Sequence, residues 1–346
     1  MSLSEAFADQ AKSCIALDSP FMGQLMKMLA EHWPEDSAIG RKFAGFEGDI
    51  GPSGASIPLR IAGGLHALVL RGDDEGLTAA YPPNKATDVA LRDAVLAAFE
   101  THETFLLGWT DSPPQTNEVR RSAALIAGAH VALQHVDLPI RLSELGASGG
   151  LNLMWDQYAL EIEGERYGPD MPALTLTPDW TGALPPQAHP QIAERAGIDL
   201  NPLDPTRPDH LLRLTAYLWA DQPHRLALTR AAASVMTSAV QQGDAIDWLA
   251  DRLPTAPEGQ LHLIQHTVAW QYFPKTAQAR GRALIEAAGA QATESRPLGW
   301  LALESDGDRT GGKGAALILR LWPGDIRLSL GRADFHGRWV NWRIAA

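Results

Sequence analysis

The spacing of apolar residues divides the chain into two regions of different texture. From residue 1 to 112, apolar positions recur every three or four residues, as in Ala6, Phe7, Ala11 and Ile15, which predicts amphipathic helices. The stretch "IPLRIAGGLHALVLRG" from Ile57 predicts a further, buried helix. We therefore expect residues 1–112 to form a helical N-terminal domain.

From residue 113 to 346, short apolar runs alternate with helical patterns. "PIRLSELGA", "AERAGID", "SAVQQGD", "QLHLIQHT" and "PLGWLALES" predict five successive strands, and helical patterns separate most of them. The last segment, "GAALILRLWPGDIRLSLGRADF", predicts a final antiparallel hairpin. Strands that alternate with helices indicate an α/β fold whose sheet is covered by helices on both faces.

One segment interrupts that alternation. Residues 159–195 are rich in proline and glycine and contain short alternating runs such as "YALEIEGERYG". We expect an insertion here, a hairpin or lid, which lengthens the connection between the first and second strands of the sheet.

Composition narrows the class of function. The 346 residues include 41 acidic and 29 basic side chains, giving a net charge of −12, which opposes binding to nucleic acid. No apolar run approaches the ~18 residues of a membrane span. A single cysteine, Cys14, excludes a disulfide within the chain and suits the cytoplasm. We expect a cytoplasmic protein that acts on a small molecule, and the sequence does not define its oligomeric state.

The stretch "SELGASGGLNL" follows the first predicted strand and supports two interpretations. Gly146, Ser148 and Gly150 form G-x-S-x-G, the nucleophile turn of α/β-hydrolases. In that hypothesis Ser148 attacks the substrate and His266 or His336 is the base. However, the hydrolase strand is apolar up to its first glycine, whereas Glu144 stands two residues before Gly146 here.

A cofactor-binding turn explains that carboxylate. Ligands of doubly wound sheets lie across the carboxyl ends of the strands, and glycines let the backbone approach them closely. Glu144, Asp199 and Asp244 end three successive predicted strands. They suit, in that order, a cationic amino-acid group, the ribose hydroxyls and an adenine amino group. Each also has a structural alternative: a strand end at a tight turn for Glu144, an Asx turn for Asp199 and a helix N-cap for Asp244.

This arrangement resembles the class I S-adenosylmethionine-dependent methyltransferases, whose seven-stranded sheet ends in an antiparallel hairpin. The resemblance implies a Rossmann-like fold, S-adenosylmethionine as cofactor and a small-molecule methyl acceptor. It implies a cofactor site made of Glu144, Gly146, Ala147, Ser148, Gly150, Asp199, Asp244 and Ala245. Two features depart from the usual pattern: Ser148 replaces the middle glycine of E-x-G-x-G-x-G, and Asp199 lies far from Glu144 along the chain.

Five motifs resemble, more closely, a bacterial family of uncharacterised proteins catalogued as a domain of unknown function. They are Q-T-N-E-x-x-R from Gln115, E-L-G-A-S-G-G-L-N-L from Glu144, G-x-D-x-N-P-x-D from Gly197, W-A-D-Q-x-x-R from Trp219 and H-G-x-W from His336. The resemblance covers at least two-thirds of the chain. The family has no settled activity to transfer.

The substrate side of the site is predicted from residues near the strand ends. His266 closes the fourth strand and is our candidate catalytic base. The expected pocket residues are Thr116, Asn117, Arg121, Trp270, Tyr272 and His336. His262 and His266 share one face of a strand, but no third ligand lies at a recognisable spacing, so we expect no metal site.

Three hypotheses of function follow from these observations. The chain is a methyltransferase that binds S-adenosylmethionine through residues 144–150, an α/β-hydrolase with Ser148 as nucleophile, or a non-catalytic binding module on the methyltransferase fold. The methyltransferase predicts binding of S-adenosylmethionine at the strand ends, and the hydrolase predicts labelling of Ser148 by a fluorophosphonate. An intact sheet whose cofactor crevice is filled by side chains would favour the binding module.

Overall fold

The structure is a computed structural model that describes residues 2–51, 54–307 and 313–344. The chain divides into two compact units, and the first is made of two separate stretches. Unit 1 comprises Met1–Thr116 and Arg207–Ala227, and unit 2 comprises Asn117–Thr206 and Leu228–Ala346. The predicted division at residue 112 thus lies close to the first boundary, but the pattern placed residues 207–227 in the C-terminal domain.

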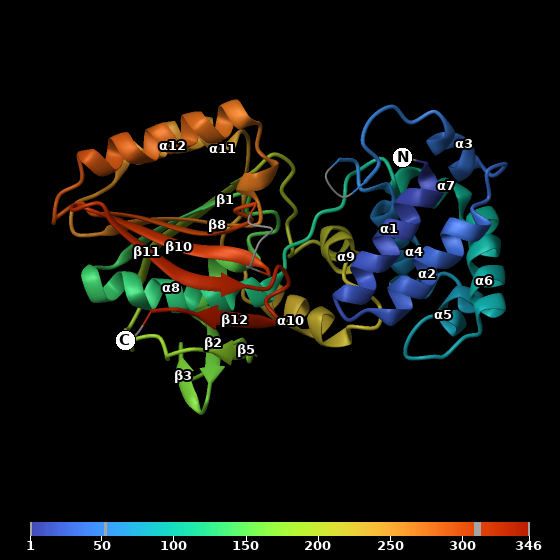
Figure 1. Cartoon of the computed structure of the whole chain (residues 1–346), viewed down its shortest axis with the longest axis horizontal. Coiled ribbons are helices and arrows are strands. Elements are labelled where there is room, and N and C mark those ends of the chain that lie inside the picture. The colour runs from blue at the N-terminus through green and yellow to red at the C-terminus, as the bar shows by residue number, and fades with distance from the viewer. Residues whose placement is uncertain (1, 52–53, 308–312, 345–346) are drawn as a thin grey trace. The chain divides into compact units, whose positions relative to one another are not determined.

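Unit 1 is helical in its described part (Figure 1). Its helices are α1 (Leu3–Ala16), α2 (Pro20–His32), α3 (Ala38–Ala44), α4 (Ile57–Arg71), α5 (Glu75–Ala80), α6 (Asp88–Thr101), α7 (Glu103–Trp109) and α9 (Pro208–Ala216). The predicted helical faces supply its core, where Phe7, Leu25, Ile61 and Leu65 are fully buried. Side-chain caps define several helix starts, for example the capping box of Ser2 and Glu5 in α1.

Residues 207–227 are tied to the rest of unit 1 by specific contacts. Gly63 of α4 leaves the space that the Tyr217 ring occupies, because a Cβ at Gly63 would lie 2.4 Å from that ring. The carboxylate of Asp221 accepts hydrogen bonds from the Ser19 hydroxyl and the Phe21 backbone NH. The returning stretch is therefore part of the unit 1 fold, although it is distant in sequence.

Unit 2 is a mixed α/β structure around a large, mostly parallel sheet. In the described residues this sheet has nine strands, in the order β5-β12-β11-β10-β9-β8-β1-β6-β7. They are β1 (Ile140–Leu145), β5 (Asp179–Thr181), β6 (Ile192–Asp199), β7 (Gln241–Gln242), β8 (Leu261–Thr267), β9 (Leu298–Glu304), β10 (Ala315–Trp322), β11 (Ile326–Ala333) and β12 (Trp339–Trp342). The predicted hairpin is present as β10 and β11, and β12 extends it.

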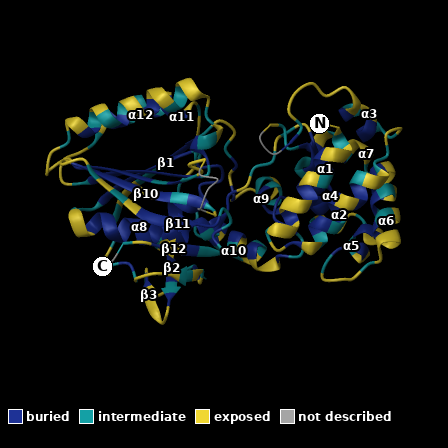
Figure 2. Ribbon diagram, viewed as in Figure 1, coloured by how far each residue is buried: buried dark blue, intermediate teal, exposed yellow. Residues whose placement is uncertain are grey.

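Helices cover both faces of this sheet (Figure 1). They are α8 (Ser122–His135) on one face, and α11 (Ala245–Arg252) and α12 (Lys275–Ala290) on the other, while α10 (Pro223–Ser234) begins in unit 1. Figure 2 shows the strands largely buried and the outer side of α12 exposed. Trp270, Ile285, Trp300 and Trp322 form the core under α11 and α12. No helix in the described part of the chain is long and apolar enough to cross a bilayer.

The insertion forms a small sheet and one strand of the large sheet. β2 (Tyr158–Ile162), β3 (Glu165–Tyr167) and β4 (Leu174–Leu176) pair in the order β3-β2-β4, and β5 pairs with β12. Tyr167 meets His130 of α8 edge-on, with the ring centroids 5.2 Å apart. The small sheet therefore packs on α8, whereas the pattern left open a lid over the glycine turn.

The order of strands changes direction beside β1. The chain moves from β1 to its parallel neighbour β6 and on to β7, and then returns to place β8 on the other side of β1. Such a change of direction leaves a crevice outside the carboxyl ends of the flanking strands, where open α/β sheets bind ligands. This edge of the sheet, where β1, β6 and β8 end, is the position of the candidate site.

Candidate functional site

The glycine turn connects β1 to η2 (Leu151–Gln157) and has a left-handed backbone at alternate residues. The φ angles of Gly146, Ser148 and Gly150 are 68°, 53° and 73°. A Cβ at Gly146 would lie 2.6 Å from the Ala269 side chain, so this position requires glycine for space as well as conformation. The NH groups of Gly146 and Ala147 both donate to the Ile198 carbonyl, which ties the turn to β6.

Ser148 occupies the position where a third glycine would relieve strain. A left-handed backbone is unfavourable for a residue with a Cβ, and Ser148 is held there by a 2.8 Å hydrogen bond from its NH to Asp199. Its side chain is buried, and its Oγ has no hydrogen-bond partner in the described structure.

We expect Ser148→Gly to stabilise the protein by about 1 kcal/mol, because the relief of left-handed strain exceeds the added entropy of the unfolded chain. Ser148→Ala removes the hydroxyl but keeps the strain, so it is the matched control. Urea unfolding of the two variants measures the difference. A Gly variant no more stable than the Ala variant would show that the turn is unstrained.

Glu144 is a buried acid without a full set of partners. Its side chain is 2% exposed, and its Oε2 has no hydrogen-bond partner in the described structure. Burial raises the pKa of this carboxyl to about 8, and the negative charge of Asp199 adds to the effect, whereas a hydrogen bond from Gln265 and the charge of Arg121 oppose it. The carboxyl is therefore mostly protonated at neutral pH.

The two later acids lie on the neighbouring strand ends but serve the backbone. Asp199 accepts hydrogen bonds from the NH of Ser148 at 2.8 Å and from the NH of Asn201 at 2.9 Å. Asp244 caps α11 through the NH groups of Ile246 and Asp247. The Asx-turn and N-cap alternatives therefore describe these carboxylates. Each Asp199 oxygen accepts one of these bonds and keeps capacity for another, whereas both NH groups at Asp244 donate to the same oxygen, Oδ1. Ala245 is the buried first residue of α11.

The Q-T-N-E-x-x-R motif contacts the same turn. The Asn117 side chain accepts a 2.8 Å hydrogen bond from the NH of Leu151, directly after Gly150. Arg121 is buried and donates to the carbonyls of Phe335 and Thr267, so it links the loop before β12 to the end of β8. The sequence motif thus marks residues that hold the carboxyl edge of the sheet together.

The comparison with known proteins adds the family. The family model described as "Uncharacterized protein conserved in bacteria (DUF2332)" matches residues 4–342. The chain belongs to this family. No curated protein and no solved structure matches it. Membership in the family brings no activity with it, so the function is argued from the geometry of the site.

His266 is engaged within the protein through both ring nitrogens. Its Nδ1 lies 2.7 Å from Glu304 Oε1, and its Nε2 accepts a 2.8 Å hydrogen bond from the Trp300 indole. Trp270 stacks on the imidazole with 5.0 Å between the ring centroids. Because the lone pair on Nε2 is already used, the ring has none to accept a substrate proton. In the structure, the predicted catalytic base therefore connects the end of β8 to Glu304 and Trp300 of β9.

The other predicted pocket residues do not form one group. Thr116 is the last residue of the first stretch of unit 1, whereas the other predicted site residues lie in unit 2. Tyr272 is 63% exposed. His336 lies in the loop before β12, where its NH donates to Asp334. Of the substrate-side predictions, Asn117 and Arg121 contact the carboxyl edge, and Trp270 lies beside it.

The hydrolase hypothesis lacks its essential contact. A serine nucleophile needs a base within hydrogen-bond reach, but Ser148 Oγ has no partner in the described structure and His266 is bound to Glu304 and Trp300. His262 contacts a different serine, Ser143, at 2.8 Å, and both are fully buried. No group of three or more potential metal ligands occurs among the described residues.

Two residues of the site escaped prediction from the sequence. Gln265 is paired with Glu144 in the register of β1 and β8, and it binds the Trp155 indole and the Asn152 carbonyl. Glu304 closes β9 and accepts hydrogen bonds from His266 and from the backbone after β8. The sequence contained an indication of Glu304, because this acid ends the fifth predicted strand in the same way that Glu144 lies near the end of the first.

Proposed function

We propose that the turn 144–150 binds the amino-acid end of S-adenosylmethionine and that the protein is a small-molecule methyltransferase with a Rossmann-like sheet. The observation that carries the proposal is a pair of buried polar atoms, Glu144 Oε2 and Ser148 Oγ, that have no hydrogen-bond partner among the described residues. Both belong to one turn at the point where the strand order reverses. Buried polar groups are nearly always paired, so two on one turn favour a ligand that completes them.

The carboxyl of Glu144 suits a cationic group once it is ionised. An ammonium that approaches it favours the ionised form, and the buried carboxylate then forms a charge-assisted hydrogen bond of the strong kind. The hydroxyl of Ser148 adds a donor and an acceptor beside it. This pair therefore supports recognition of an amino-acid group, which S-adenosylmethionine carries.

The neighbouring strand ends suit the nucleoside. Asp199 uses each carboxylate oxygen for one backbone NH and keeps acceptor capacity for ribose hydroxyls. Asp244 follows β7, the strand that pairs with β6. The NH of Gly243, the residue before Asp244, donates a hydrogen bond to the Asp199 carbonyl and so keeps the two strand ends together. The order Glu144, Asp199, Asp244 across neighbouring strands supports a ligand that would place its amino-acid group, ribose and adenine in that order.

In this proposal the site residues position the cofactor and the methyl acceptor, and they contribute little acid–base chemistry. The sulfonium of the cofactor supplies the methyl group, and transfer depends on alignment and exclusion of water. Since both nitrogens of His266 are occupied, the acceptor must be nucleophilic without help from this base. The binding part of the proposal stands separately: S-adenosylmethionine binding without turnover would identify the non-catalytic module.

We expect S-adenosylmethionine to bind more tightly as pH rises from 6 to 7.5, by up to about tenfold per pH unit, because Glu144 must lose its proton when the ammonium binds. Isothermal titration calorimetry at several pH values, in buffers of different ionisation enthalpy, measures both the affinity and the released proton. Glu144→Gln should remove the pH dependence and the proton release.

Adenosine is the matched ligand control, because it lacks the amino-acid end. Its affinity should be independent of pH over this range and equal in the wild type and Glu144→Gln. Absence of S-adenosylmethionine binding at millimolar concentration would reject the proposal, and binding with no pH dependence would reject the role of Glu144. Labelling of Ser148 by a fluorophosphonate would restore the hydrolase hypothesis.

A further inference from the structure

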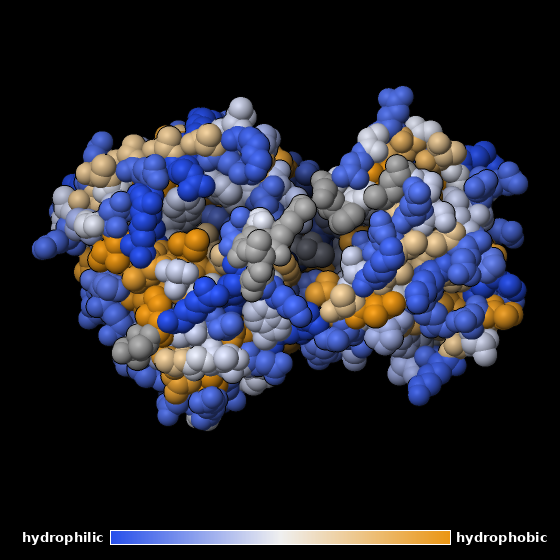
Figure 3. All heavy atoms as spheres, in the orientation of Figure 1, coloured by the Kyte–Doolittle hydropathy of each residue, from blue (hydrophilic) through white to orange (hydrophobic). Residues whose placement is uncertain are grey.

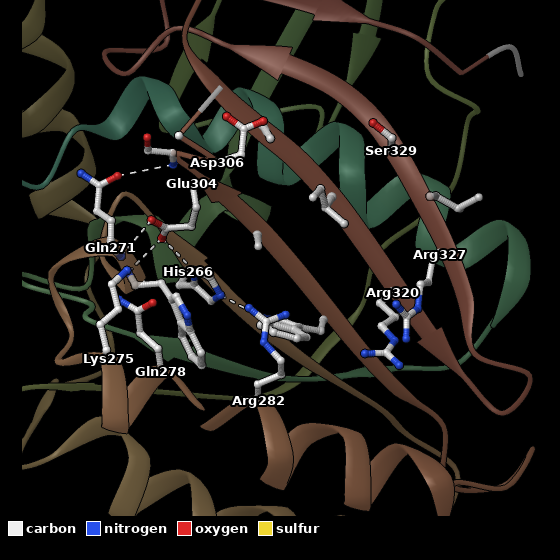
Figure 4. Close-up of a pocket in the computed structure, with 18 residues that line it drawn as sticks. His266, Gln271, Lys275, Gln278, Arg282, Glu304, Asp306, Arg320, Arg327 and Ser329 are labelled. Carbon is white, nitrogen blue, oxygen red and sulfur yellow. Dashed lines mark hydrogen bonds and ion pairs between the residues drawn. The ribbon is translucent and has the colours of Figure 1, made fainter. Parts of the chain in front are cut away.

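A groove of about 890 Å³ lies between α12 and the strands β9, β10 and β11 (Figure 4). Pockets of this size accept ligands of a few hundred daltons. Trp270 and Gln271 border it at the carboxyl end of β8. Arg320 of β10 and Arg327 of β11, which lie opposite each other in the register of these two strands, border the other end. The groove therefore runs along the face of the sheet that α12 covers.

The floor of the groove is apolar. Trp300 and Ala302 of β9 and Ala316 and Ile318 of β10 line it, and Ile318 is 44% exposed. In Figure 3 hydrophobic atoms gather on this part of unit 2, and hydrophilic side chains border them. An open apolar floor with a polar rim is typical of a binding groove.

The charges on its rim are unequally matched. Glu304 is satisfied by His266 and by backbone NH groups, and Asp306 pairs with Arg332. On α12, Lys275 and Arg282 line the groove and form no ion pair within the described part of the chain. The two groove acids are thus satisfied by other parts of the protein, whereas Lys275 and Arg282 have no anionic partner among the described residues.

Arg282 is held beside the floor of the groove. Its guanidinium lies 5.7 Å from the centre of the Trp300 ring. Lys275 is the first residue of α12, a helix that has no acidic residue in its first turn and no capping side chain. The positive end of the helix dipole thus adds to the charge of Lys275, and both attract an anion.

We infer that this groove binds an amphipathic organic anion, a medium-chain carboxylate whose head pairs with Lys275 and Arg282 and whose apolar body lies on Trp300 and Ile318. Charge complementarity selects the head group, and the apolar floor of β9 and β10 selects the body. This site is separate from the glycine turn, because the segment after β8 directs Ala269 toward Gly146 and Trp270 toward the groove. The inference does not depend on S-adenosylmethionine binding.

Calorimetry with sodium decanoate below its micelle concentration, on the full chain at low salt, tests the inference. We expect saturable binding that weakens about tenfold in Lys275→Gln/Arg282→Gln, because charge-assisted hydrogen bonds are lost. Ile318→Ser should also weaken it, through loss of apolar contact. Arg280→Gln is the matched control, since Arg280 lies on the same helix but pairs with Asp247 outside the groove.

Decyltrimethylammonium has the same chain with the opposite charge and should not bind. Equal binding of both amphiphiles, unchanged affinity in the double variant, or no decanoate binding at millimolar concentration would each overturn the inference. Thermal unfolding of the variants, whose altered side chains are exposed, checks that they fold. Glu144→Gln should leave decanoate affinity unchanged, which separates this outcome from that of the proposed function.

Discussion

Glu304→Ala is expected to destabilise the protein by about 3–5 kcal/mol, because it leaves several buried donors without an acceptor. The carboxylate accepts from His266 Nδ1 at 2.7 Å and from the NH groups of Ala269, Trp270 and Gln271 at 2.9, 3.0 and 3.4 Å. The loss should also free the segment after β8, which packs on the glycine turn. Urea unfolding at pH 7 measures the change.

We also expect the contribution of Glu304 to the free energy of unfolding to depend on pH. Burial of Glu304 favours its neutral form, but hydrogen bonds from His266 and the backbone hold its pKa below the ordinary 4.5. Its contribution is therefore full above pH 4.5 and lost as pH falls through the lower folded-state pKa. The exposed Glu294→Ala is the control and should change stability by less than about 0.5 kcal/mol. A similar small change in Glu304→Ala would contradict the network.

Glu144→Gln is expected to have the opposite effect and to stabilise the protein by roughly 4 kcal/mol at pH 8.5. Burial raises the pKa of Glu144 from 4.5 to about 8, so the folded state holds a proton that the unfolded state loses between these values. Wild-type stability therefore falls as pH rises from 4.5 to 8, and the penalty is complete above pH 8. Glutamine keeps the shape without the charge.

The comparison of two pH values distinguishes this cause from simple repacking. At pH 5 the wild type and Glu144→Gln should differ by less than about 1 kcal/mol, because the carboxyl is then mostly neutral in the folded state. Glu294→Gln should show no difference at either pH. A stabilisation of Glu144→Gln that is equal at pH 5 and pH 8.5 would show that ionisation of Glu144 is not its source.

The sequence predicted the parts of this fold that depend on local pattern. The strand at 140–145, the glycine turn and the helices on both faces follow from short-range spacing, and the structure contains them. Glu144 was identified because a charge beside a glycine turn is unusual in a buried strand. Asp199 and Asp244 were located at strand ends, and the Asx-turn and N-cap alternatives predicted their local backbone hydrogen bonds. The hydrogen bond from Ser148 to Asp199 was not predicted, because it joins residues that are distant in the sequence.

Long-range partners account for what was missed. Nothing local to His266 shows that Glu304 and Trp300 will occupy its two nitrogens, because these residues come from the next strand. The strand β5 joins the large sheet only through β12, more than 150 residues later in the chain. The membership of residues 207–227 in unit 1 likewise depends on pairing with helices near the start of the chain.

That return of the chain sets an order for folding during synthesis. Unit 1 cannot be complete until residue 227 has left the ribosome, and by then β1, the glycine turn and β6 have also emerged. Until residues 207–227 are synthesised, the helices near the start of the chain leave part of their core exposed, since Tyr217 fills the space beside Gly63. The nascent chain therefore carries two half-built units at once, and a fragment that ends at residue 116 lacks a piece of its own interior.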